Sequence, residues 1–207
     1  VKASTINGTT VEGSLQDITE RFAATERLEF LAHHDPLTEC LNLRGIASSL
    51  GRSALLPSAL AYFDLNRFKL INDLYGHASG DRVIKEVCER IKEMIGNHGM
   101  LARVGGDEFV IAFSDLTVTQ ATVLCESVVN AITSVPYQIG SQRFTLGVSA
   151  GLVGTRRFGD APLKEIISAA DTLCRMAKKR PGQQLIVMES DDSFFSQHKQ
   201  ELEVMAC

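Results

Sequence analysis

The stretch LARVGGDEFVIAF, residues 101–113, restricts the fold of this chain more than any other segment. Two short apolar runs flank a Gly-Gly step, which is a strong β-hairpin signal because tight hairpin turns use positive φ angles. The sequence therefore predicts two antiparallel strands here. Asp107 and Glu108 follow the glycines, although strands disfavour acidic residues. Either they are ordinary solvent-facing residues of a turn, or they belong to a functional site.

Patterns typical of helices and strands alternate around this hairpin. We expect helices that end near residue 51, that break at Gly76, and that cover about 79–96, 121–132 and 163–177. We expect a buried strand that ends at Asp64, two strands joined at Gly140-Ser141, and a short strand near 183–189. This order predicts an α/β fold of the α+β type, with a ferredoxin-like βαββαβ core and a central, mostly antiparallel sheet covered by helices.

Composition excludes several classes of protein. The 207 residues include 44% apolar and 22% charged side chains, which suits one soluble domain with a short extension. The net charge of −4 predicts no broad basic face, and hence no nucleic-acid partner. No apolar run approaches the length of a membrane span, so we expect no membrane contact by this fragment. Five scattered cysteines favour a reducing, cytoplasmic location, and leave open a membrane anchor elsewhere in a longer protein.

A third acid, Asp64, indicates a role for the two acids of the hairpin. The run SALAYFD is apolar until Asp64, and an acid at the end of a buried strand is costly unless it is solvated, paired or bound to a cation. If this strand pairs with the hairpin, Asp64 lies near Asp107 and Glu108. Three close carboxylates repel one another, and a hard cation relieves the repulsion. The cluster therefore suits Mg²⁺, with Mn²⁺ as an alternative, together with a triphosphate, as in nucleotidyl transfer.

The stretch NRFKLINDLYGHASGD, residues 66–81, offers groups that could read a base. Asn72 supplies an amide and Asp81 a carboxylate, and a carboxylate accepts from the N1–H and amino group of guanine. A purely structural interpretation stays open: Asp81 caps the following helix and Asn72 occupies a turn. Lys69 either contacts phosphate or is a solvated surface lysine. The chemistry of His77 favours an ordinary loop residue over a catalytic base.

Three blocks together resemble the GGDEF family, the diguanylate cyclases. They are HHDPLTECLN, FDLNRFKLINDLYGHASGD and RVGGDEF, in that order, and the resemblance runs from about residue 31 to residue 188. The upstream stretch VEGSLQDITER resembles the end of a PAS sensory domain. We therefore expect a PAS-like remnant at 1–16, a linker helix at 17–34, a GGDEF domain at 35–189, and a helical connector at 190–207 that resembles those leading into an EAL phosphodiesterase domain.

The resemblance implies a reaction and a set of site residues. Such enzymes condense two GTP into cyclic di-GMP, release two pyrophosphates, and work as homodimers in which each subunit presents one GTP. The implied catalytic acids are Asp107, the acceptor of the ribose 3′-hydroxyl proton, and Glu108. The implied metal ligands are Asp64, the backbone carbonyl of Leu65, Asp107 and Glu108. The implied substrate contacts are Asn72 and Asp81 on guanine, His77 beside the nucleotide, Gly105 and Gly106 along the triphosphate, and Lys69 and Lys178 on phosphates.

The sequence departs from the family pattern in two places that bear on activity. Residues 96–99 read GNHG, so the Arg-x-x-Asp product site is missing and feedback inhibition through it is not expected. The last helix runs into AKKRPGQQ, which keeps Lys178 but lacks the usual later arginine. Arg180 is a candidate substitute, although Pro181 stiffens the turn differently. An alternative function is therefore a GTP-binding regulatory domain that controls an attached EAL phosphodiesterase with little turnover. A purely structural dimerisation domain ranks below both, because it needs no such set of acids.

Overall fold

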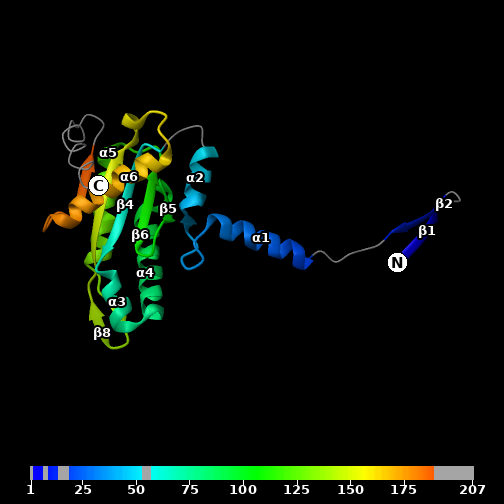
Figure 1. Ribbon diagram of the computed structural model, residues 1–207, viewed down its shortest axis with the longest axis horizontal. Helices are drawn as coiled ribbons and strands as arrows, with labels where there is room; N and C mark the ends of the chain where they lie inside the picture. The colour runs from blue at the N-terminus through cyan, green and yellow to red at the C-terminus, as the bar shows by residue number, and fades with distance from the viewer. Residues whose placement is uncertain (1, 7–8, 14–18, 53–56, 189–207) are drawn as a thin grey trace, which may run out of the picture. The chain divides into compact units, whose positions relative to one another are not determined.

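The computed structural model describes residues 2–6, 9–13, 19–52 and 57–188 (Figure 1). The chain divides into two compact units between Ala32 and His33. In the first, β1 (Lys2–Ile6) and β2 (Thr9–Gly13) form an antiparallel hairpin. Helix α1 (Thr19–His33) follows, within the range 17–34 where the sequence predicts a helix, and its role as a linker stays a prediction. The first two residues of the predicted linker helix, 17 and 18, and the predicted connector at 190–207 lie outside the described residues.

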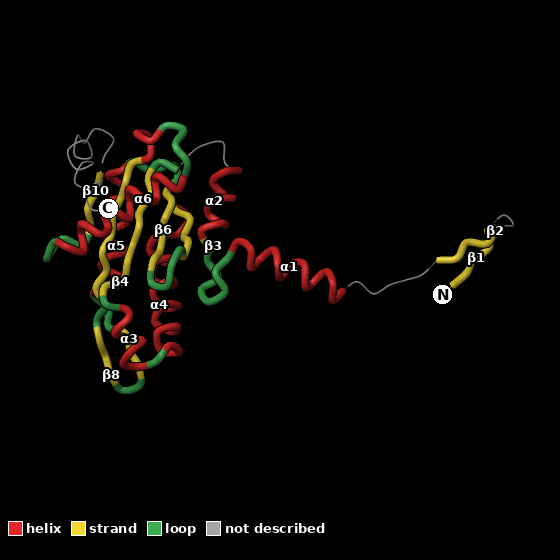
Figure 2. The backbone as a smooth tube through the Cα atoms, viewed as in Figure 1, coloured by secondary structure: helices red, strands yellow, loops and turns green. Residues whose placement is uncertain are grey.

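The second unit alternates short strands with helices (Figure 2). Its elements are, in chain order, β3 (Leu41–Asn42), α2 (Leu43–Arg52), β4 (Ala59–Asn66), α3 (Phe68–Tyr75), α4 (His77–Ile95), the 3-10 helix η1 (Gly96–His98), β5 (Gly99–Arg103), β6 (Glu108–Phe113), α5 (Val118–Thr133), β7 (Tyr137–Ile139), β8 (Gln142–Phe144), β9 (Gly147–Gly154), the 3-10 helix η2 (Thr155–Phe158), α6 (Leu163–Lys179) and β10 (Leu185–Met188). No helix in these described segments is long and apolar enough to cross a membrane.

Six of these strands form one sheet in the order β10-β9-β4-β6-β5-β3. The four central strands pair antiparallel, whereas β10 lies parallel to β9 and β3 parallel to β5. The connectivity β4, α3 and α4, β5, β6, α5, β9 is the predicted βαββαβ core. The fold class expected from the sequence is confirmed.

Helices cover both faces of the sheet, and the side chains of β4 alternate between them. Phe63 and Leu65 pack with α3, α4 and α5 in one apolar cluster, while Leu60 and Tyr62 pack with α2 and α6 in a second. Asp64 continues the second alternation and therefore lies on the side of α6. This position brings a carboxylate near the end of that helix.

Three expected boundaries are wrong. β4 does not end at Asp64 but continues to Asn66, because it stays paired with β9 down to Gly147. The segment after Pro136 forms three strands rather than two: β7 and β8 pair around Gly140 as a separate hairpin, and β9 then enters the main sheet. Helix α4 begins at His77, directly after Gly76 (φ +80°), so Asp81 lies inside the helix and is not its N-cap.

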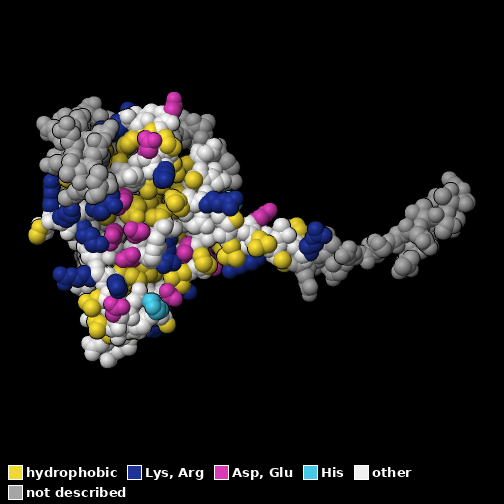
Figure 3. Space-filling view, viewed as in Figure 1, with side chains coloured by type: hydrophobic (Ala, Val, Ile, Leu, Met, Phe, Trp, Pro, Cys, Tyr) yellow, Lys and Arg dark blue, Asp and Glu magenta, His cyan; other side chains and the backbone are white. Residues whose placement is uncertain are grey.

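The described cysteines are all free and buried, and they are Cys40, Cys88, Cys125 and Cys174. None therefore forms a disulfide within the described part of the chain. On the face shown in Figure 3, acidic and basic side chains are interspersed over the described surface. Neither sign of charge dominates that face.

Candidate active site

The pairing of β4 with β6 brings the predicted acids to one end of the sheet. Asp64 lies opposite Glu108 in the antiparallel register, as the sequence argument required. The backbone N–H of Leu65 donates a hydrogen bond of 3.2 Å to the carbonyl oxygen of Asp107. Segments more than forty residues apart are thus fixed beside each other by main-chain bonds, which hold the carboxylates on rigid elements.

The glycines of the hairpin turn do not adopt the backbone conformation expected of them. Neither Gly105 nor Gly106 has a positive φ angle, so the prediction of a tight turn with positive φ angles is wrong. A Cβ atom at Gly105 would lie 2.0 Å from Oε2 of Glu108, whereas a Cβ at Gly106 would meet nothing within 4 Å. Gly105 therefore makes room for the Glu108 carboxylate, and Gly106 leaves the turn open for a close approach by a ligand.

Arg103 anchors this turn, and the sequence analysis did not single it out. Its Nε and Nη2 donate hydrogen bonds of 3.2 and 2.7 Å to the carbonyl oxygen of Gly106. Its Nη1 forms an ion pair of 3.0 Å with Asp35, whose carboxylate also accepts from the hydroxyl and backbone N–H of Thr38. Arg103 and Asp35 both lie within the blocks that carry the family resemblance, which is the one sequence signal that pointed to them.

The electrostatics of the site are those of acids held close together. Burial, and then the nearby charge of Asp64, raises the pKa of Asp107 above its ordinary value. Nζ of Lys178, in the last turn of α6, lies 2.7 Å from Oδ1 of Asp64 and offsets part of this charge. Burial, followed by the charge and hydrogen bond of Glu108, raises the pKa of the Tyr62 hydroxyl. The phenol therefore stays neutral and can donate to Glu108.

The donor set fits a hard cation of the magnesium type, with two carboxylates rather than three. Across the described residues, no group of three or more His, Cys, Asp or Glu side chains is placed to hold a metal ion. The charge of Asp64 raises the pKa of Asp107, and the backbone N–H of Leu65, the residue after Asp64, donates to the carbonyl oxygen of Asp107. Mg²⁺ is commonly held by one or two carboxylates, with water and phosphate oxygens completing its shell.

The two residues predicted to read guanine come from neighbouring helices. The side chain of Asn72, on α3, packs against Gly80 of α4 so closely that a Cβ there would lie 1.9 Å from Oδ1 of Asn72. Gly80 is a buried residue that the sequence analysis missed, and it directly precedes the exposed Asp81. The structure thus brings the amide of Asn72 beside the turn of α4 that carries Asp81.

The remaining predicted residues are exposed at the surface of the domain. Lys69 in the first turn of α3 and His77 at the start of α4 are exposed. Arg180, considered as a substitute for the missing arginine, is exposed and donates to Oε1 of Gln183 at 3.3 Å, within its own turn. These positions neither test nor exclude contacts with phosphate, and their roles stay predictions.

The fold is of the nucleotidyl cyclase palm type: an antiparallel βαββαβ sheet with acids at the end of its central strands. Residues 32–184 match the family described as "Diguanylate cyclase, GGDEF domain". The chain therefore belongs to the GGDEF family.

Curated relatives are similar over most of this chain but are much longer. The chain is 32% identical to the cyclic di-GMP phosphodiesterase PdeB of Shewanella oneidensis over 86% of its length, and 31% identical to the probable diguanylate cyclase DgcE of Escherichia coli over 84%. It spans only 21% and 16% of those proteins.

Solved structures agree on the fold. Diguanylate cyclase SiaD of Pseudomonas aeruginosa superposes with a TM-score of 0.69 at 25% identity, covering 83% of this chain and 69% of that one. The coiled coil and GGDEF domain of DgcB from Caulobacter crescentus gives a TM-score of 0.73 at 22% identity, covering 83% and 94%.

Proposed function

We propose that this domain is a diguanylate cyclase, which condenses two GTP into cyclic di-GMP and two pyrophosphates in a homodimer. The observation that supports this most directly is the placement of Asp64 opposite Glu108, with Asp107 bonded to Leu65 and Lys178 on Asp64. These are the acids and the cation that binding and activation of a triphosphate require.

Asp107 is the proposed proton acceptor. In each half-reaction the 3′-hydroxyl of one GTP attacks the α-phosphorus of the other, its proton passes to Asp107, and pyrophosphate leaves. The raised pKa of Asp107 makes this carboxylate a stronger base than an ordinary aspartate. Mg²⁺, when bound by Asp64, Asp107 and the Leu65 carbonyl, with Glu108 supporting the site from the next position, would lower the hydroxyl pKa and neutralise charge on the phosphates.

Other residues position the substrate in this proposal. Asn72 and Asp81 hydrogen-bond the guanine edge, and His77 lies along the nucleotide. Lys69 and Lys178 contact phosphate oxygens, and the open Gly106 allows the triphosphate to approach the main chain. One domain holds one GTP, so two copies must face each other for two phosphodiester bonds to form.

A second candidate is a GTP-binding regulatory domain with little turnover. Arg180 donates a hydrogen bond to Gln183 within its own turn, and this contact favours a site without the family's later arginine. Relatives named as phosphodiesterases, and a solved Vibrio cholerae LapD fragment described as S helix-GGDEF-EAL, support a regulatory arrangement. In either case we propose an upstream PAS-like partner domain, a downstream EAL domain and a cytoplasmic location for this part of the protein.

The test is incubation of the purified protein with GTP and Mg²⁺ over a range of protein concentrations, with cyclic di-GMP followed by chromatography. Product formed at a rate per mole that rises with concentration supports a cyclase assembled by dimerisation. Asp107→Asn should abolish product while GTP still raises the melting temperature. GTP binding without any product from the unaltered protein would favour the regulatory role.

A further inference from the structure

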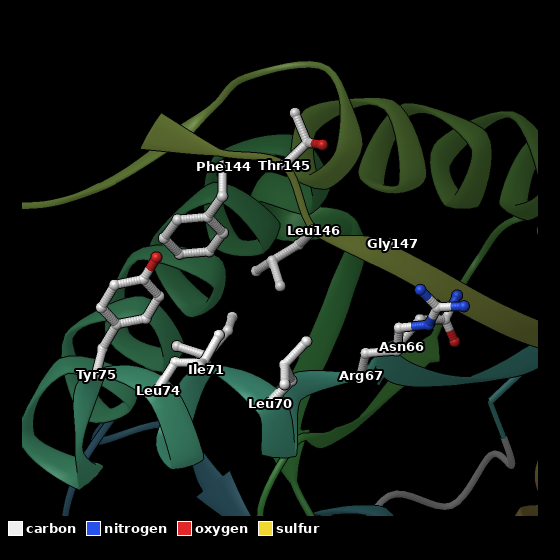
Figure 4. Close-up of a pocket in the computed structure, with 10 residues that line it drawn as sticks. All are labelled: Asn66, Arg67, Leu70, Ile71, Leu74, Tyr75, Phe144, Thr145, Leu146 and Gly147. Carbon is white, nitrogen blue, oxygen red and sulfur yellow. The ribbon is translucent and has the colours of Figure 1, made fainter. Parts of the chain in front are cut away.

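A pocket of about 450 Å³ lies between α3 and the strands β8 and β9, and none of the residues assigned to GTP lines it (Figure 4). One wall is formed by four residues of α3 and the opposite wall by residues 144–147. The lining residues are Leu70, Ile71, Leu74 and Tyr75 on α3, Phe144, Thr145, Leu146 and Gly147 opposite, Asn66 at the end of β4, and Arg67 just before α3. Its volume is that of an ordinary small-molecule site. Asn72 lies on another face of α3, packed on Gly80, so the guanine residues do not line it.

The walls of this pocket are apolar although they face solvent. Leu70 is 52% and Leu74 64% exposed, and both lie on one stripe of α3 with Ile71. Tyr75 and Phe144 stack at 6.2 Å with their rings 12° apart and close one end of the pocket. Exposed leucines beside stacked aromatic rings are typical of a surface that buries an apolar ligand.

The opposite end of the pocket is polar and cationic. Figure 4 shows the guanidinium of Arg67 beside Asn66 at the end remote from Tyr75. Oδ1 of Asn66 accepts a hydrogen bond of 3.0 Å from the Ser149 hydroxyl, which fixes the side-chain amide. Arg67 is held in a left-handed conformation (φ +60°) before α3 begins. In the described part of the chain its guanidinium has neither an ion pair nor a hydrogen bond, so five donors remain for an anion.

We propose that this pocket binds a small amphipathic monocarboxylate. Its apolar body lies between Leu70 and Leu74 on one side and Leu146 and Phe144 on the other, and its carboxylate accepts hydrogen bonds from Arg67 and Asn66. An Arg–carboxylate contact is geometrically specific because the planar guanidinium donates two parallel bonds. No residue assigned to the proposed cyclase reaction lines this pocket, and binding here does not depend on that reaction.

The test is titration of the unaltered protein with decanoate, measured by calorimetry, with 1-decanol as the neutral probe of the same chain length. We expect saturable, one-site binding of decanoate, at least tenfold tighter than binding of decanol. Arg67→Asn removes the charge while keeping a residue that tolerates the left-handed conformation, and should remove this preference. Leu74→Gln should weaken both probes at least fivefold by removing apolar contact.

The matched control is Val123→Gln on α5, which replaces an apolar side chain that is 57% exposed and does not line the pocket. It should bind decanoate as the unaltered protein does. Absence of saturable decanoate binding would overturn the proposal, as would decanoate binding by Arg67→Asn or by Leu74→Gln that is as tight as in the unaltered protein. Weakening by Val123→Gln equal to that by Leu74→Gln would show non-specific surface adsorption and would also overturn it.

Discussion

Lys178 and Asp64 form an ion pair of 2.7 Å that joins the last turn of α6 to the end of β4. The side chain of Asp64 is 20% exposed and that of Lys178 is 44% exposed, so both remain reachable by a ligand. The pair holds a lysine next to the acids on which the proposed metal and triphosphate would lie. It thereby places a cation in the site before any ligand arrives.

Replacing Lys178 with methionine should weaken GTP binding without unfolding the domain. Loss of one charge-assisted hydrogen bond costs about 1.5–3 kcal/mol, which corresponds to roughly a tenfold to hundredfold rise in Kd. Calorimetric titration with a non-hydrolysable GTP analogue and Mg²⁺ measures this. Lys179→Met, one residue further and also exposed, is the control and should bind normally. Equal affinities for the two variants would remove Lys178 from the phosphate site.

Gly80→Ala should impair the choice of guanine over adenine. The new Cβ would overlap Oδ1 of Asn72, whose amide must move because Gly80 is buried against α3. We expect the stabilisation by GTP relative to ATP, measured as the difference in thermal shift, to shrink by half or more. Gly51→Ala in α2, where a Cβ meets nothing within 4 Å, should leave that difference intact. A fully retained preference for GTP in Gly80→Ala would contradict the role of Asn72.

The two glycines of the hairpin should respond differently to alanine. Gly105→Ala forces the Glu108 carboxylate to a new rotamer, because the Cβ would lie 2.0 Å from Oε2. We therefore expect turnover to fall at least tenfold while the melting temperature changes little, since a carboxylate end can move aside. Gly106→Ala meets no atom in the free domain, so its melting temperature should match the unaltered protein. A large loss of stability in Gly106→Ala would show that the turn is not open.

Most of the fold could be predicted because it rests on local patterns. The period of apolar residues marked α4, α5 and α6, and the two runs around Gly105 marked β5 and β6. The prediction that the strand ending near Asp64 pairs with this hairpin was confirmed by its register with Glu108. An acid at the end of an otherwise apolar strand was the informative signal, since burial of a carboxylate costs free energy unless polar groups, water or a cation surround it.

What the sequence could not predict depends on contacts between distant segments. The close approach of Glu108 to Gly105 is set by a side-chain rotamer, so the sequence argument attributed the glycine to a positive φ instead. The bond between Arg103 and Asp35 joins residues 68 positions apart, which no local pattern reveals. Asp81 was interpreted as a possible N-cap because aspartate is common at N-caps, and the residue type alone does not distinguish that position from one in the first turns of the helix.

Arg103→Ala should destabilise the domain by about 2–4 kcal/mol, because it leaves a largely buried carboxylate unpaired and frees the Gly106 carbonyl. The exposed fractions of the two side chains are only 14% for Arg103 and 17% for Asp35. Urea unfolding measures the change. Arg175→Ala breaks an ion pair of equal length with Asp171, but Arg175 is 60% exposed, so a loss below about 1 kcal/mol is expected. Similar losses in the two variants would contradict an anchoring role for Arg103.

The contribution of Asp35 to stability should disappear in acid. Burial alone would raise the pKa of Asp35, but hydrogen bonds from Thr38 and the Arg103 guanidinium outweigh it and hold that pKa below its ordinary value. The unfolded chain, with an aspartate pKa of about 3.9, therefore takes up a proton at higher pH than the folded domain does. The stability due to ionised Asp35 is complete above about pH 5 and is lost as pH falls through 4 and then through the folded pKa.

Urea unfolding of the unaltered protein and of Asp35→Asn at pH 7, 5, 4 and 3 measures this contribution, because other acids titrate alike in both proteins and cancel in the difference. We expect the unaltered protein to be more stable by about 1–3 kcal/mol at pH 7 and 5, since a hydrogen bond to a charged group is lost in the variant. The difference should shrink between pH 4 and 3 as Asp35 becomes protonated. A difference that stays constant down to pH 3, or one that grows, would mean that the Arg103 and Thr38 bonds do not favour the ionised carboxylate.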